Sequence, residues 1–164
     1  MSRSVRAFRL NKPIVGIGML KNIVLATDGS AYSDAAALCI AGRTLLAQDA
    51  MVHVLHCTPD VSGEVKMFLG HADIAAWHQE ESDKAMASVV AILLKADIPF
   101  EAHGLVGFAP ERIIQYSRSV QAEAIVMGSH GRGAFFDAVL GSVASRVVAR
   151  ADCPVLLAKA PRVV

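Results

Sequence analysis

Short apolar runs alternate along the chain with longer segments in which apolar residues recur at helical spacing. The predicted strands cover residues 21–28, 51–57, 99–106, 123–127 and 154–158, and the clearest apolar run is the first of them. Runs of this length without polar alternation are typical of strands buried on both faces of a parallel sheet. Because helical segments separate them, the pattern predicts an α/β domain with right-handed crossovers and helices on both faces of the sheet.

The intervening segments carry their own start signals and apolar faces. Ser30 can cap the first helix, and Pro110 suits the first turn of a later one. The buried faces that the spacing predicts comprise Leu38, Ala41, Gly42 and Leu45 in the first helix, Met86, Val89, Val90 and Leu93 in the second, and Val143, Ala144, Val147 and Val148 in the last. The helical spacing of apolar residues is weakest in residues 60–85.

Residues 1–18 differ from the rest of the chain. They carry several basic residues and no acidic one, followed by Pro13, Gly16 and Gly18. This composition predicts little regular structure, so we expect an N-terminal extension of residues 1–18 before a single domain of residues 19–164. Met19 is an equally good starting residue.

Composition narrows the class of protein. Apolar residues make up 54% of the chain, charged residues 19%, and the net charge is +1. Such a chain has ample core material and no basic excess to attract nucleic acid or an anionic membrane, so we expect neither as a partner. No apolar run reaches the roughly 18 residues of a membrane-spanning helix.

The three cysteines are odd in number and far apart in the sequence. Cys39, Cys57 and Cys153 each lie in an apolar segment. This placement suits buried thiols better than a disulfide framework, and buried thiols are typical of a reducing compartment. We therefore expect a cytoplasmic protein.

Residues 125–150 hold the strongest candidate for chemistry. An apolar strand runs into a glycine-rich turn, and a glycine–serine pair then begins a helix; the residues concerned are Gly128, Gly131, Gly141 and Ser142. A helix N-terminus offers unpaired N–H groups and a favourable dipole, so this arrangement suits phosphate binding. For any single glycine, the simpler interpretation is that it ends a strand or begins a helix.

Histidines give no comparable metal pattern. His53 and His56 fit polar strand ends or core positions better than metal ligands. His71 and His78 lie seven residues apart and could share a helical face, but the neighbouring sequence supplies no further ligands. We predict no metal site built from protein side chains alone.

The spacing of the glycine motif resembles a known family. Gly128, Gly131, Gly141 and Ser142 match the G-x2-G-x9-G-[ST] pattern of the ATP-binding branch of the universal stress protein family. The segments NIVLATDGS, LHC, VMGSHGRG and CPVLLAK are similar to the family's segments in the same order, from Met19 to Lys159. The resemblance implies a Rossmann-like, three-layer α/β/α sandwich whose five parallel strands have the order 3-2-1-4-5.

The resemblance also implies a nucleotide site at the carboxyl ends of strands one and four. Carried over by position, its residues are Ala26, Thr27, Asp28, Cys57, Met127, Gly128, His130, Gly131, Arg132, Gly141, Ser142 and Val143. Asp28 would lie against the nucleotide, Cys57 would give adenine an apolar contact, and Arg132 could reach a phosphate. Gly141 and Ser142 would offer N–H and hydroxyl donors to the phosphates. Ala26 stands where some family members have Pro.

The implied ligand is ATP, with AMP and ADP as alternatives and Mg²⁺ or Mn²⁺ accompanying the phosphates. The only titratable candidates near the predicted crevice are Asp28 and His130, without a catalytic triad or a Walker-type lysine. We therefore expect no catalytic residues and a nucleotide-dependent stress-response regulator with at most slow hydrolysis. An adenylating enzyme and a nucleotide-independent dimeric scaffold remain alternatives, although ATDGSAYSD differs from the SGGxDS-like loop of the former.

The last strand bears on assembly. Residues 154–158, PVLLA, would form an aggregation-prone sheet edge if left bare. The resemblance implies that this edge pairs across a two-fold axis, so we expect a homodimer. The sequence does not identify the downstream protein partner.

Overall fold

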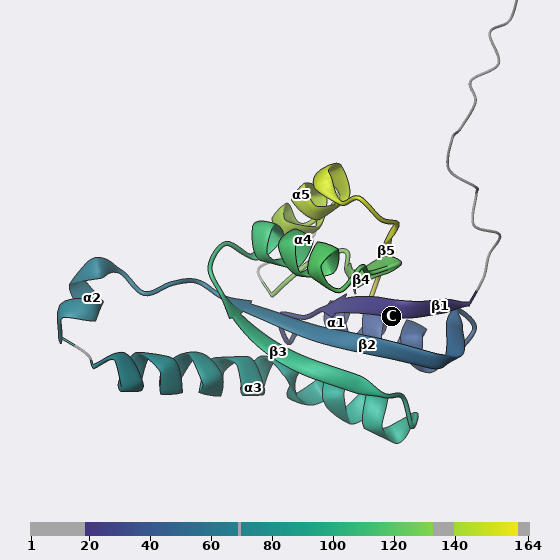
Figure 1. Ribbon diagram of the computed structural model, residues 1–164, viewed down its shortest axis with the longest axis horizontal. Helices are drawn as coiled ribbons and strands as arrows, with labels where there is room; N and C mark the ends of the chain where they lie inside the picture. Colours follow the sequence, from purple (N-terminus) through teal and green to yellow (C-terminus); the bar gives the residue numbers. More distant parts are fainter. Residues whose placement is uncertain (1–18, 69, 133–139, 161–164) are drawn as a thin grey trace, which may run out of the picture.

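A five-stranded parallel sheet forms the middle layer of the protein (Figure 1). The computed structural model describes residues 19–68, 70–132 and 140–160. The strands are β1 (Leu20–Ala26), β2 (Leu46–Thr58), β3 (Phe100–Val106), β4 (Ala124–Gly128) and β5 (Val155–Ala158), in the order β3-β2-β1-β4-β5. The helices are α1 (Ala31–Ala41), α2 (Gly63–Phe68), α3 (His71–Lys95), α4 (Ala109–Ser119) and α5 (Ser142–Arg150). The predicted fold class and strand order are confirmed, while residues 1–18 lie outside the described residues.

Helices cover both faces of the sheet. Figure 1 shows α1 and α3 on one side and α4 and α5 on the other. In β1, Ile23 and Leu25 join the core beneath α1 and α3, whereas Val24 and Ala26 join the core beneath α4 and α5. Since residues 23–26 of this strand are buried on both faces, all four are apolar, which explains the continuous apolar run.

Helix α1 does not bury the face that the spacing predicted. Its buried apolar residues are Ala35, Ala36, Ala37 and Ile40. Leu38 is 57% exposed, and the helix ends at Ala41, so Leu45 lies outside it. Alanines let the helix approach the sheet closely. A face made of alanines is not detected when the buried side of a helix is predicted from the spacing of large apolar residues. Strand β2 also begins at Leu46, five positions before the predicted Met51.

Two other burial predictions need correction. Cys39 is exposed, while Cys57 and Cys153 are only partly buried, so the expectation of three buried thiols is wrong for Cys39. In α5, Ala144 and Val147 are buried as predicted, but Val148 is 47% exposed. Val148 lies one position past the buried Val147, where the helix has turned away from the sheet, and Cys39 lies beside the exposed Leu38 on the outer side of α1.

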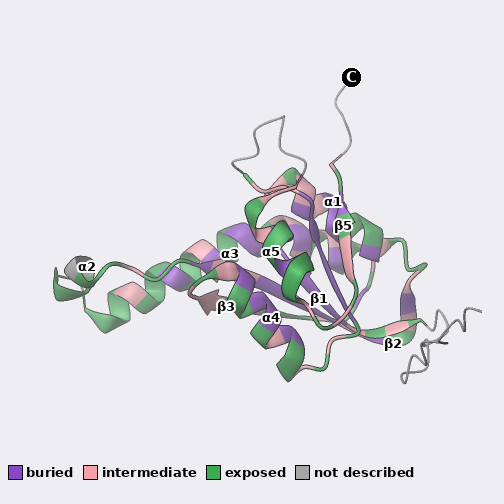
Figure 2. Cartoon of the chain, turned by 90° about the horizontal axis from the view of Figure 1, so that it is seen from above, coloured by how far each residue is buried: buried purple, intermediate pink, exposed green. Residues whose placement is uncertain are grey.

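The segment of weakest pattern forms α2 and the first half of α3. Figures 1 and 2 show these elements extending beyond the sheet, with mostly exposed residues at their far end. The core contacts of α3 come from its second half, through Met86, Val89 and Leu93. Because the first half has no sheet beneath it, its sequence lacks the apolar periodicity of a packed helix.

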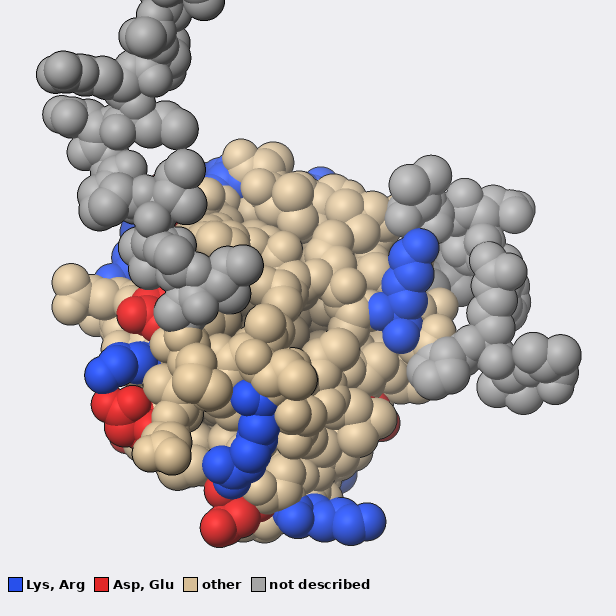
Figure 3. Space-filling view, turned by 90° about the vertical axis from the view of Figure 1, so that its right-hand side faces the viewer, with Lys and Arg blue, Asp and Glu red and all other residues tan. Residues whose placement is uncertain are grey.

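Charged side chains are dispersed on the face of the molecule that Figure 3 shows. Lys and Arg lie there at separate positions, with uncharged or acidic surface between them. No helix in the described parts of the chain combines the length and apolar character needed to cross a membrane.

Candidate functional site

A cavity of about 490 Å³ lies at the carboxyl ends of β1, β2 and β4. Strand β1 lies between β2 and β4, so the strand order reverses at this point. The chain continues from β1 to β2 on one side of β1 and later returns from β3 to β4 on its other side. Open α/β sheets bind ligands at such a switch in strand order. The N-terminal residues of α4 and α5, including Ala109 and Ser142, complete the wall.

Asp28 fixes the turn between β1 and α1. Its Oδ1 accepts hydrogen bonds from the Ser30 amide at 3.1 Å and the Ser33 hydroxyl at 2.9 Å, and its Oδ2 accepts one from the Arg132 amide at 2.9 Å. Burial alone would raise the pKa of this carboxyl, but the hydrogen bonds outweigh burial and lower the pKa. The ionised Asp28 therefore joins the turn after β1 to the loop after β4. Ser30 caps α1, as predicted.

The motif glycines allow three close contacts between segments of the same chain. A Cβ atom at Gly128 would lie 2.6 Å from the Cβ of Tyr32, and one at Gly131 would lie 2.6 Å from Asp28 Oδ2. At Gly141 it would lie 3.2 Å from backbone atoms of Ser129 and His130. These glycines therefore bring the loops together around the cavity, a packing role that motif spacing alone does not distinguish from ligand approach.

The N-terminus of α5 faces the cavity without a capping side chain. Gly141 is the N-cap residue, and its own amide donates to the Ser129 carbonyl at 2.8 Å. The expectation that Gly141 offers an N–H group to a ligand is therefore wrong. The donors of the first helical turn belong instead to Ser142, Val143 and Ala144, which all line the cavity.

The predicted residues gather in one place, with one exception. Those that line the cavity are Ala26, Thr27, Asp28, Cys57, Met127, Gly128, His130, Gly131, Gly141, Ser142 and Val143. Arg132 is exposed and lies outside the lining. Its guanidinium donates to the Asp28 carbonyl oxygen, so it is held against the turn after β1 rather than directed at the cavity. Residues 133–139, between the motif glycines, lie outside the described residues.

Comparison with known proteins decides the family. The sequence profile described as "Universal stress protein family" matches residues 19–159. The chain belongs to the universal stress protein family.

Two relatives and one solved structure show how far the similarity extends. A universal stress protein of Thermus aquaticus is 37% identical over 145 residues, covering 86% of this chain and all of the relative. One from Methanocaldococcus jannaschii is 30% identical over 153 residues, covering 90% of this chain and 86% of the relative. The universal stress protein of Archaeoglobus fulgidus, solved in complex with dAMP, has a TM-score of 0.59 and 25% identity, covering 87% of this chain and all of that chain.

Sequence reasoning missed part of the cavity wall in this universal stress protein. The additional lining residues are Ser33, Leu55, His56, Ala109, Ile113, Leu140 and Ala144. Leu55 was within reach of the sequence, because it shares a strand face with Cys57 two positions later. Ala109 and Ile113 were not, since only the packing of α4 on the sheet brings them to the cavity.

The thiol in the cavity wall is unreactive, and the histidines there have polar contacts within the protein. Burial raises the pKa of the Cys57 thiol to about 11, so the nucleophilic thiolate is scarce near neutral pH. The Nδ1 atoms of His56 and His130 lie 2.9 Å from the Thr27 carbonyl and 3.0 Å from the Ser129 hydroxyl. Among the described residues that line the cavity there is no Lys or Arg. The site thus combines apolar walls with the amides of a helix N-terminus.

Proposed function

We propose that this universal stress protein binds an adenine nucleotide, ATP in the first place, and acts as a nucleotide-dependent regulator in a stress response. The observation that carries the proposal is the apolar cavity that opens onto the uncapped N-terminus of α5. A nucleotide presents the matching chemistry, because its base is flat and largely apolar while its phosphates are anionic. The dAMP complex of the Archaeoglobus fulgidus relative supports the same ligand class.

Each end of the cavity suits one part of the ligand. Ala26, Leu55, Cys57 and Ile113 provide the apolar wall for adenine. The amides in the first turn of α5 would receive the phosphates. Since the lining residues supply no cationic side chain, Mg²⁺ or Mn²⁺ would accompany ATP and offset the phosphate charge.

Binding is better supported than turnover. Asp28, the carboxylate in the lining, already accepts hydrogen bonds from Ser30, Ser33 and Arg132. A general base must reach the proton that it abstracts, and this carboxylate is committed to holding two loops together. We therefore propose that ATP is hydrolysed slowly at most, and that occupancy rather than chemistry conveys the signal.

Proline and alanine at Ser142 test where the phosphates bind. Ser142 is the first helical residue, a position that tolerates proline, and Gly141 before it has φ −65° and ψ 151°, which a following proline also permits. Ser142→Pro removes the amide donor with little change to α5, whereas Ser142→Ala removes only the hydroxyl. With one charge-assisted hydrogen bond lost, we expect affinity for ATP to fall about 10- to 100-fold in the proline variant.

Isothermal titration of nucleotide-stripped protein with ATP, ADP and AMP in the presence of Mg²⁺ measures these affinities. The alanine variant is the matched control and should bind more tightly than the proline variant. If wild-type protein binds none of the three nucleotides at millimolar concentration, the proposal fails. If both variants bind ATP as wild type does, the phosphates do not bind at α5.

We further propose a homodimer that forms through β5. This strand is at one edge of the sheet, and Leu157 within it is 37% exposed. An unpaired strand edge readily pairs with another chain. Light scattering at micromolar concentration measures the mass in solution, and the mass of a single chain would contradict the dimer.

A further inference from the structure

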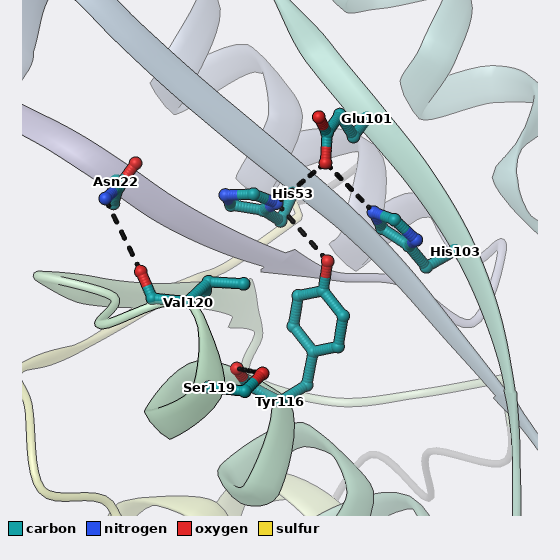
Figure 4. A network of polar contacts seen from close by, with 7 residues as sticks. All are labelled: Asn22, His53, Glu101, His103, Tyr116, Ser119 and Val120. Atoms are coloured by element: carbon teal, nitrogen blue, oxygen red, sulfur yellow. Dashed lines mark hydrogen bonds and ion pairs between the residues drawn. The ribbon is translucent and has the colours of Figure 1, made fainter.

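A histidine cluster lies on β2 and β3, outside the nucleotide cavity. It consists of His53 on β2 with Glu101 and His103 on β3 (Figure 4). His53 pairs with Glu101 in the sheet register, and His103 is two positions further along the same strand. Residues two apart on a strand point to the same face, so all three side chains converge beneath Tyr116 of α4.

The spacing of the ligand atoms matches that around a metal ion. Glu101 Oε2 lies 3.6 Å from His53 Nδ1 and 3.4 Å from His103 Nε2, and one ligand atom from each residue falls within 4.8 Å of the others. With bonds of about 2.0–2.1 Å, a tetrahedral zinc ion holds its nitrogen and oxygen ligands about 3.3 Å apart. Two of the three spacings are therefore already close to those of a bound ion. No other group of His, Cys, Asp or Glu in the described parts of the chain gathers in this way.

The cluster leaves one ring nitrogen without a hydrogen-bond partner. His103 Nε2 is shielded from solvent and has no hydrogen-bond partner among the described residues, although Glu101 Oε2 lies 3.4 Å away. Buried polar atoms without a partner are uncommon and call for an explanation.

We propose that His53, Glu101 and His103 bind a divalent transition-metal ion, with Zn²⁺ as the best match. Two imidazoles and one carboxylate are a known zinc ligand set, and they leave one coordination position for water. The Tyr116 hydroxyl, which forms a hydrogen bond with His53 Nδ1 at 3.4 Å in the metal-free cluster, would lie close enough to contact that water once Nδ1 binds the ion. Glu101 is 55% exposed, which gives the ion a route from solvent.

This ion differs in chemistry from the cation that accompanies a nucleotide. Mg²⁺ prefers oxygen ligands, whereas imidazole nitrogen selects transition metals. A bound ion would tie the edge strand β3 to β2. Leu55 pairs with His103 and also lines the nucleotide cavity, so the two sites are adjacent on one face of the sheet. The metal site nevertheless stands without the proposed nucleotide.

Titration of metal-free, nucleotide-free protein with Zn²⁺ against a chromophoric chelator tests the proposal. We expect one ion per chain and a rise in the melting temperature on binding. Glu101→Gln and His103→Gln each remove a metal ligand and should lower the affinity for Zn²⁺ by about 100-fold or more. Substituting a residue that only orients a ligand lowers metal affinity by about 10- to 100-fold. His71→Gln is the matched control, because His71 is exposed on α3 and lies outside the cluster.

Co²⁺ provides a second measurement, since its visible absorption is strong in four-coordinate sites and weak in six-coordinate ones. The wild-type protein and the His71→Gln variant should give the four-coordinate spectrum, and the two cluster variants should lose it. The proposal is overturned if wild type binds no Zn²⁺ at about 100 μM free ion, because a dissociation constant above that concentration is too weak for a specific site. It is also overturned if the cluster variants bind as wild type does, or if His71→Gln removes binding.

Discussion

The cavity proposed to bind a nucleotide and the histidine cluster share one face of the sheet, but their polar groups are satisfied to opposite degrees. Around the cavity, the Asp28 carboxylate is saturated by neighbouring donors, and open space remains beside the amides of α5. In the cluster, side chains converge and His103 Nε2 still has no hydrogen-bond partner among the described residues. Space with free backbone donors suits a bulky anion, whereas converging lone pairs suit a small cation.

This difference also separates the two kinds of structural support. The cavity depends on close packing of loops, in which motif glycines and Asp28 bring the carboxyl ends of β1 and β4 together. The cluster depends only on strand register, because pairing in the sheet brings His53 beside Glu101. Substitutions at the cavity should therefore affect the stability of the protein far more than substitutions in the metal-free cluster.

The largest effect is expected at Gly128. In Gly128→Val the new Cβ would lie 2.6 Å from the Tyr32 Cβ and 2.9 Å from its carbonyl carbon, so β4 and α1 must move apart. We expect the free energy of unfolding to fall by about 3 kcal/mol, as measured by urea denaturation. Gly63→Ala is the matched control, because nothing lies within 4 Å of a Cβ there, and it should change stability by less than about 0.5 kcal/mol. Equal stability of the two variants would contradict the packing role.

A smaller effect, with a pH signature, is expected at Asp28. Asp28→Asn removes the charge that binds the Ser33 hydroxyl and the Arg132 amide. Because the side chain is only partly buried, we expect a loss of about 1 kcal/mol at neutral pH. The folded-state pKa is lowered, so the stabilisation is complete above the unfolded carboxyl pKa of about 3.9 and is lost as pH falls through the lower folded value.

Urea denaturation of wild type and Asp28→Asn between about pH 2 and pH 7 measures this dependence. The difference in unfolding free energy should be constant near neutral pH and should narrow below about pH 4. A difference that stays constant down to pH 2 would show that the charge of Asp28 does not hold the two loops together.

The smallest effect is expected at Glu101 in protein freed of metal. Its contacts with His53 and His103 are long, 3.6 and 3.4 Å, and its side chain is largely exposed. Exposed ion pairs contribute little, so Glu101→Gln should change the free energy of unfolding by less than about 0.5 kcal/mol. A loss above about 1 kcal/mol would mean that the ion pairs already satisfy the cluster, and the contrast with the cavity would disappear.

Much of the fold was predictable because the relevant signals are local. Strand positions buried on both faces must be apolar, so residues 23–26 of β1 and 124–127 of β4 are evident as continuous apolar runs. The failure at α1 has an equally local cause, since its buried face consists mainly of alanines and Leu38 points outward. Cavity residues such as Leu55 follow from strand alternation, but Ile113 depends on where α4 packs.

The sequence by itself determined the strand–helix alternation, the family and the glycine–serine motif, because each is written in contiguous or regularly spaced residues. Only the tertiary structure decided that Gly141 uses its amide within the protein and that Arg132 turns toward Asp28. It alone brought His53 beside Glu101 and His103, which lie 48 and 50 positions later in the chain. Strand pairing is non-local, so no spacing along the chain records which side chains will share a site.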